Sequence, residues 1–151
     1  MDNITFFNRI TLVIFKKLYE AFPQPIDLNI NAIAMEVIPQ DADETLTWNS
    51  LMAAGQAIDF LAQEGFLTHK GALKDNSKVH QARLTLRGLT ILGSTPDSLD
   101  GKTPLIDQIK EALSSGANEA KNETFRQLAQ QTFNAALAAA PRIITNILTN
   151  S

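Results

Sequence analysis

The chain has 151 residues, of which 44% are apolar and 19% charged, and this composition argues against a largely disordered chain. It contains no cysteine, which excludes disulfides and thiolate metal sites, and with no basic leader and no bilayer-length apolar run we expect a cytoplasmic protein without a membrane span. The net charge of −3 is unevenly spread, because residues 1–65 hold three bases and nine acids whereas residues 66–93 hold five bases and one acid.

The first predicted helix spans residues 3–22. Its apolar residues recur every three or four positions and so form one apolar face, made of Phe7, Ile10, Ile14, Leu18 and Phe22. Asp2 or Asn3 is suited to cap this helix, and Pro23 ends it because the residue before a proline avoids helical angles. A very short strand at 26–28 and a second short helix at 32–37 follow.

A third helix is predicted at 46–64, with Gly65 as its stop residue. An acidic run precedes it, at Asp41, Asp43 and Glu44, which suits the positive end of the helix macrodipole. Trp48, the only tryptophan, has two open interpretations: it is a contact anchor for a partner, or it packs between the second and third helices.

A β-hairpin is predicted next, with strands at 66–69 and 79–84 and a polar, basic tip between them. Thr85 stands where a cap belongs for the following helix at 86–92. His69 and His80 face each other if the turn centres near residue 74, but two histidines and one nearby acid fall short of the three or four ligands of a zinc site. We therefore expect neither a metal nor a cofactor.

The last third, after a linker at 94–103, is predicted to be helical from 104 to 151, and Pro141 is expected to end or kink the final helix. Its apolar side chains exceed what a lone appended helix needs, and we expect five of them to form a homodimer interface: Phe125, Leu128, Phe133, Leu137 and Ile144. Packing of these helices on their own domain is the alternative.

Two segments carry a resemblance to a known superfamily. Residues 60–67 read Phe-Leu-Ala-Gln-Glu-Gly-Phe-Leu, and residues 82–89 read Ala-Arg-Leu-Thr-Leu-Arg-Gly-Leu at hairpin distance. This resembles the wing pattern of winged helix-turn-helix regulators of the MarR-like and PadR-like types, over roughly residues 4–93. The implied fold is α+β and mostly α, with a winged helix-turn-helix domain at 1–93 and a C-terminal helical extension.

In such proteins the third helix enters the DNA major groove and the hairpin, or wing, contacts phosphate or the minor groove. The resemblance therefore implies a transcription regulator that binds double-stranded DNA and is not an enzyme. Helix residues would read bases and wing residues would hold phosphates, and the candidates are Thr47, Asn49, Ser50, Gln56, Lys70, Lys74, Lys78 and Arg83. The third helix, however, has no Lys or Arg, although phosphate neutralisation supplies most DNA affinity. The alternative is a winged-helix protein-interaction module that does not bind DNA.

Overall fold

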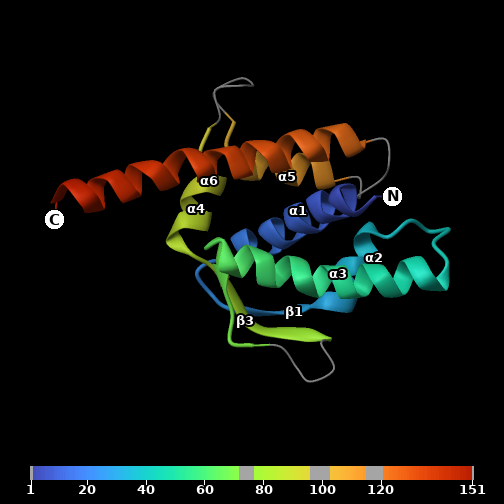
Figure 1. The fold of residues 1–151 in the computed structure, drawn as a ribbon. Coiled ribbons are helices and arrows are strands. Elements are labelled where there is room, and N and C mark those ends of the chain that lie inside the picture. The colour runs from blue at the N-terminus through green and yellow to red at the C-terminus, as the bar shows by residue number, and fades with distance from the viewer. Residues whose placement is uncertain (1, 72–76, 96–102, 115–120, 151) are drawn as a thin grey trace.

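The computed structural model describes residues 2–71, 77–95, 103–114 and 121–150, with side chains described up to residue 138. Helices surround a small antiparallel sheet (Figure 1), which confirms the expected α+β, mostly helical class. The elements in chain order are α1 (Asn3–Ala21), β1 (Ile26–Asn29), α2 (Ile30–Val37), α3 (Glu44–Gln63), β2 (Leu67–Thr68), β3 (Lys78–Leu84), α4 (Leu86–Leu92), α5 (Leu105–Leu113) and α6 (Asn122–Asn150).

Helix α1 is the centre of the molecule. The Asp2 side chain caps it by accepting a hydrogen bond from the Thr5 N–H at 2.7 Å. The helix contacts α2 and α3 as well as α5 and α6, so it is buried on more than the one face predicted, and Leu12, Val13 and Phe15 lie in the core too. This central position explains why the chain has one continuous core that includes both the first 93 residues and the C-terminal helices.

The three strands lie in the order β1-β3-β2, with both pairs antiparallel. Gln81 has a φ of 51° and interrupts the register between β1 and β3. This extra residue shifts the alternation along β3, so that Val79 and Ala82 both face the core although they are three positions apart. The Asp27 carboxylate holds the bulge by accepting a hydrogen bond from the Gln81 N–H at 3.0 Å.

The connection from α3 to the sheet depends on a close approach of backbones. Gly65 has a φ of 83°, and the Phe66 N–H donates to the Leu61 carbonyl at 3.0 Å, as expected where a helix ends in the left-handed conformation. Thr85 caps α4 by accepting from the Gly88 N–H at 3.0 Å and also donates to the Gly65 carbonyl at 2.6 Å. Gly88 sits directly against the Phe66 carbonyl, which leaves no room for a side chain.

The C-terminal helices pack on α1. Phe125 and Leu128 of α6 are buried in the common core. The helix continues through Pro141 to Asn150, so the prediction that it ends at Pro141 is wrong. Its C-terminal part extends past the other elements (Figure 1).

Arg9 of α1 is buried, with 1% of its surface exposed. Its guanidinium donates to the Val37 carbonyl at 3.2 Å and to the Asn122 side chain, and it lies 6.0 Å from the centre of the Phe125 ring. This arginine therefore connects α1 with the end of α2 and the start of α6.

Candidate interaction surface of α3 and the wing

Helix α3 presents one continuous exposed face. Its exposed residues recur at helical spacing, and they are Thr45, Trp48, Asn49, Met52, Gln56, Asp59, Phe60 and Gln63. Trp48 is 65% exposed and Met52, one turn further on, is 49% exposed. The interpretation that Trp48 packs between α2 and α3 is therefore wrong. Met52 was not singled out from the sequence, although its position four residues after Trp48 places both on one face.

The start of this helix is acidic. The Asp43 carboxylate caps it by accepting from the Leu46 N–H at 2.7 Å, and Glu44 lies in its first turn. Asp41 just before them is also exposed. The predicted helix-start role of the acidic run is thereby confirmed, and it places negative charge at the end of α3 from which a DNA-reading helix contacts its target.

Two of the four base-reading candidates on α3 are exposed and two are not. Asn49 and Gln56 lie on the exposed face. Ser50 is buried, with 5% of its surface exposed, because it shares the core-facing side of the helix with Ala54 and Ala57; the expectation that it points outward is wrong. Thr47 is half-buried and lies seven residues before Ala54, on the same inner side.

The wing, residues 66–84, lies beside the exposed face of α3. Lys70, Lys78 and Arg83 are exposed, whereas the predicted contact Lys74 lies outside the described residues. The Nε2 atom of His69 is 3.4 Å from the Asp59 carboxylate, and its Nδ1 atom accepts from the Gly71 N–H at 3.0 Å. Since Asp59 follows Met52 by two helical turns, this contact sets the wing next to the same side of α3.

The two histidines contact different acids. His80 Nδ1 is 3.6 Å from the Asp27 carboxylate, whereas His69 contacts Asp59. The hydrogen bond from the Gln81 N–H lowers the pKa of the Asp27 carboxyl below its usual value, and attraction to His80 acts in the same direction. Among the described residues, no three His, Cys, Asp or Glu side chains gather as a metal site would require.

The predicted dimer contacts on α6 divide into two groups. Phe125 and Leu128 are buried in the core of their own chain, and the Phe133 ring stacks on Phe7 at 5.9 Å, so the prediction that these three form an intermolecular interface is wrong. They pack in cis because α1 needs a cover on this side. Leu137 is 68% exposed, and the side chain of Ile144 lies outside the described part.

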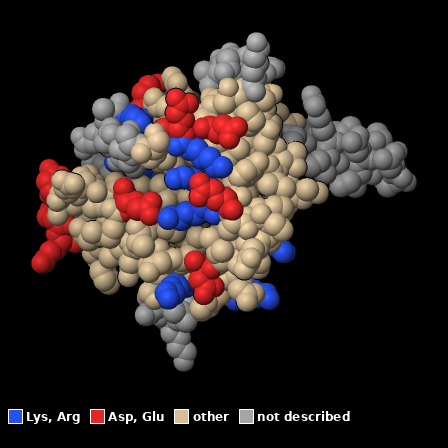
Figure 2. Space-filling model, turned by 180° about the vertical axis from the view of Figure 1, so that it is seen from behind, with Lys and Arg blue, Asp and Glu red and all other residues tan. Residues whose placement is uncertain are grey.

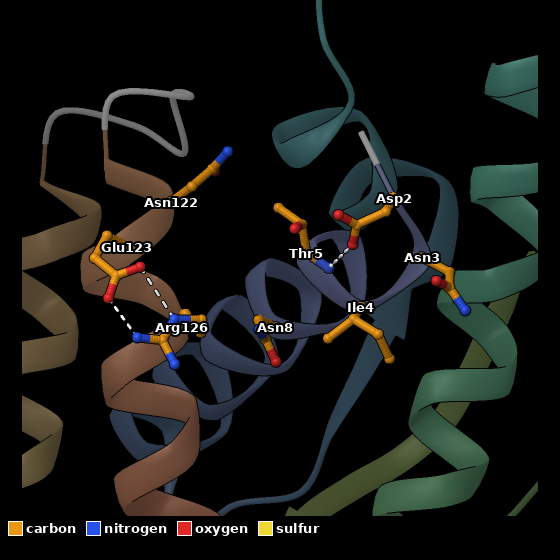
Figure 3. A pocket seen from close by; sticks show the side chains of 8 residues that line it. All are labelled: Asp2, Asn3, Ile4, Thr5, Asn8, Asn122, Glu123 and Arg126. Atoms are coloured by element: carbon orange, nitrogen blue, oxygen red, sulfur yellow. Dashed lines mark hydrogen bonds and ion pairs between the residues drawn. The ribbon is translucent and has the colours of Figure 1, made fainter.

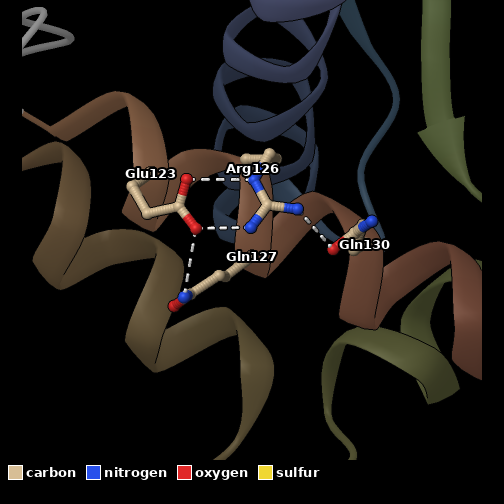
Figure 4. Close-up of polar contacts among 4 residues, drawn as sticks. All are labelled: Glu123, Arg126, Gln127 and Gln130. Carbon is tan, nitrogen blue, oxygen red and sulfur yellow. Dashed lines mark hydrogen bonds and ion pairs between the residues drawn. The ribbon is translucent and has the colours of Figure 1, made fainter.

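A polar pocket lies between the starts of α1 and α6 (Figure 3). It contains Asp2, Asn8 and Asn122, and its one base is Arg126. Arg126 pairs with Glu123 and donates to the Gln130 side chain at 3.0 Å (Figure 4), and this pairing lowers the pKa of Glu123. Because its base is already neutralised by a neighbouring acid and Asp2 is engaged as a helix cap, the pocket offers little to a charged ligand.

The face opposite α3 carries no broad patch of one charge. On the side seen in Figure 2, Lys and Arg are interspersed with Asp and Glu. Extended basic surfaces are what nucleic acids bind, so this side offers no such surface. Within the residues described, no helix combines the length and apolar content that crossing a bilayer requires.

The chain matches no protein-family model, and no curated protein and no solved structure shows significant similarity to it. Function therefore has to be argued from the surface itself.

Proposed function

We propose that residues 1–93 form a winged helix-turn-helix domain. The support is topological: the order α1-β1-α2-α3-β2-β3, with β3 pairing to both other strands, is the arrangement of that fold. The motif residues Gly65, Thr85 and Gly88 lie at the junction of α3, the wing and α4, where the resemblance requires a helix stop, a cap and a close approach.

The domain acts as a protein-interaction module whose binding surface is the exposed face of α3. The observation that carries this proposal is that Trp48 and Met52 are exposed on a helix face without a single Lys or Arg. Large apolar side chains contribute most of the binding energy in protein interfaces, tryptophan above all. Exposing two of them together costs solubility and is favourable only where a partner covers them.

The charge of α3 disfavours DNA as that partner. Asp41, Asp43 and Glu44 lie at its start and Asp59 near its end, and no base occurs between Leu18 and His69. DNA affinity comes largely from neutralising phosphates, and an acidic helix start repels them instead.

The same charge indicates the chemistry of the protein partner. An apolar pair bordered by acids fits a segment that presents apolar side chains flanked by Lys or Arg. Opposite charges at the rim raise the association rate and select against acidic partners, while the buried apolar contacts hold the complex.

Because Trp48 is the only tryptophan, its fluorescence reports directly on this face. We expect a helical peptide of alternating Leu and Lys faces to shift the Trp48 emission to shorter wavelength in a saturable way. A matched peptide with Glu in place of Lys serves as the charge control and should bind far more weakly. Equal binding of both peptides, or of neither, would contradict the proposed partner chemistry.

Met52→Glu tests the position of the contact. The substitution places a charge in the centre of the apolar pair and should raise the Kd of the Leu/Lys peptide at least about tenfold. Leu86→Glu is the matched control, because Leu86 is 78% exposed but lies on α4, and it should leave the Kd unchanged. If both variants bind like the unsubstituted protein, the contact is not on α3.

Duplex DNA held by the wing is a second candidate function, favoured by the exposed bases Lys70, Lys78 and Arg83. If the wing holds phosphates, duplex binding at low salt should weaken steeply with added salt, and Lys70→Glu with Lys78→Glu should lower the slope by about two contacts, each worth ~0.9. Lys16→Glu with Lys17→Glu on α1 is the control of equal charge change. Absence of binding at low salt rules this candidate out.

A further inference from the structure

A shallow groove of about 430 Å³ runs between the start of α1 and the second half of α3. None of the residues that line it is charged, and they are Asn3, Ile4, Phe6, Phe7, Ala53, Gln56, Ala57 and Phe60. Ile4 is 62% exposed and Phe60 44% exposed, so apolar surface remains in contact with water along the groove. The small side chains Ala53 and Ala57 leave space of the kind into which a side chain of another helix inserts.

The groove is the surface end of a chain of aromatic contacts. Phe60 meets Phe7 edge-on at 5.5 Å, and Phe7 stacks on Phe133 of α6 at 5.9 Å. Phe133 in turn contacts Phe66, which belongs to the core. The walls of the groove are therefore fixed by packing, and a partner would find them already formed.

Helix α6 carries an apolar stripe that outlasts its cover. Phe133, Leu137, Ala140, Ile144 and Ile147 are spaced by alternating steps of four and three, which is the heptad pattern of helices that pack on other helices. Phe133 is packed on its own chain, but Leu137 is 68% exposed. From there the helix continues to Asn150, away from the other elements (Figure 1), and residues 137–150 include one charged residue, Arg142.

We propose that the chain forms a two-fold dimer in which residues 137–148 of α6 from each protomer pack into the α1/α3 groove of the other. Both surfaces are apolar and almost uncharged, and neither is covered within the chain. The groove of the same chain is not the occupant's site, because α6 runs past it at Phe133 and then leads away (Figure 1). A reciprocal exchange closes the assembly and provides two equal contacts, which helps to reach the ~1,200 Å² typical of stable interfaces.

This dimer does not depend on the proposed function. Trp48 lies one turn before Met52 on the side of α3 toward the wing, whereas Ala53 and Phe60 border the groove on the other side. The peptide assay at Trp48 and the oligomeric state of the protein therefore fail or succeed separately.

Sedimentation velocity over a range of protein concentrations tests the proposal, with the full chain expected to be a dimer at micromolar concentration. Leu137→Glu on α6 and Ile4→Glu in the groove should each raise the dimer Kd at least about tenfold, because either places a charge in the apolar contact. Leu86→Glu, equally exposed but on α4, should leave the dimer intact. Both exposed sites tolerate Glu in the folded monomer, which circular dichroism verifies.

Mixing the two variants tests the exchange itself. A heterodimer of Ile4→Glu and Leu137→Glu chains retains one unaltered contact, so the mixture should dimerise at concentrations where each variant alone is monomeric. A monomeric unsubstituted protein would overturn the proposal. So would a mixture that stays monomeric, or an Ile4→Glu variant that dimerises normally, since the latter would mean that the α6 helices pair with each other.

Discussion

At the scale of single residues, Gly88 is the position where the fold allows no substitution. A Cβ there would overlap the Phe66 carbonyl and lie 3.3 Å from the Leu84 side chain. Gly88→Ala should therefore lower the free energy of unfolding by about 1–3 kcal/mol, as overpacking does. Gly55→Ala in α3 is the control: its Cβ would meet only Ile30 at 3.7 Å, so helix propensity should leave it neutral or stabilise it by up to about 1 kcal/mol. Urea unfolding measures both, and equal effects would refute the close approach at Gly88.

Asp27 gives the fold a pH dependence of known sign. The hydrogen bond from the Gln81 N–H lowers the pKa of its carboxyl, so the folded state favours the ionised form. The resulting stabilisation is complete above the ordinary pKa of about 3.9 and is lost as the pH falls through the lower value of the folded state. Asp27→Asn should therefore flatten the acid side of the stability curve, measured by urea unfolding from about pH 5 downward. Parallel loss of stability in both proteins below pH 4 would contradict this role.

Local residue roles were predictable from the sequence and burial was not. Asp2 and Thr85 were predicted as caps, and the cap of a helix depends only on a few neighbouring residues. Ser50 was placed on the wrong side of α3 because a small polar residue fits either an exposed or a tightly packed position. Which applies depends on the helix that packs there, and this is not encoded locally.

At the scale of secondary-structure elements, Arg87 of α4 links three parts of the chain. Its guanidinium donates to the Glu64 carbonyl at 2.6 Å and to the Ala136 carbonyl at 3.1 Å, and it lies 5.7 Å from the centre of the Phe66 ring. Arg87→Met keeps the apolar stem but removes both charged donors, and should cost about 1.5–3 kcal/mol of unfolding free energy. Arg83→Met on the exposed side of β3 is the control and should change the stability little. A loss that is equal in both would show that Arg87 does not connect α4 to α6.

The element boundaries followed from periodicity and capping, but the destination of the C-terminal helices did not. The apolar stripe of α6 was visible in the sequence, and the hypothesis assigned all of it to a partner chain. The structure instead buries Phe125 and Leu128 on α1, whose residues Leu12, Val13 and Phe15 need cover outside the predicted apolar face. The buried Arg9 was not foreseen either, since a single base on a helix is usually solvated.

At the scale of the whole molecule, the uneven charge distribution is the main guide to function. The excess of acids in residues 1–65 lies partly around the exposed face of α3, whereas bases are exposed on the neighbouring wing. The sequence predicted this asymmetry and the hairpin that carries the bases. It did not predict that Trp48 and Met52 would lie together on the surface, because an apolar residue on a short helix is more often buried. That exposed pair moves the proposed partner from DNA to protein.

The central claim is that the exposed face of α3 does not bind DNA, and Trp48 emission during titration with mixed-sequence duplex DNA at low salt tests it most directly. We expect the emission to stay unchanged over the whole titration, even if the wing holds the duplex, because no base near Trp48 on α3 brings a phosphate to that face. A saturable quench or shift of the Trp48 emission that disappears with added salt would contradict the claim and make α3 a DNA-binding helix.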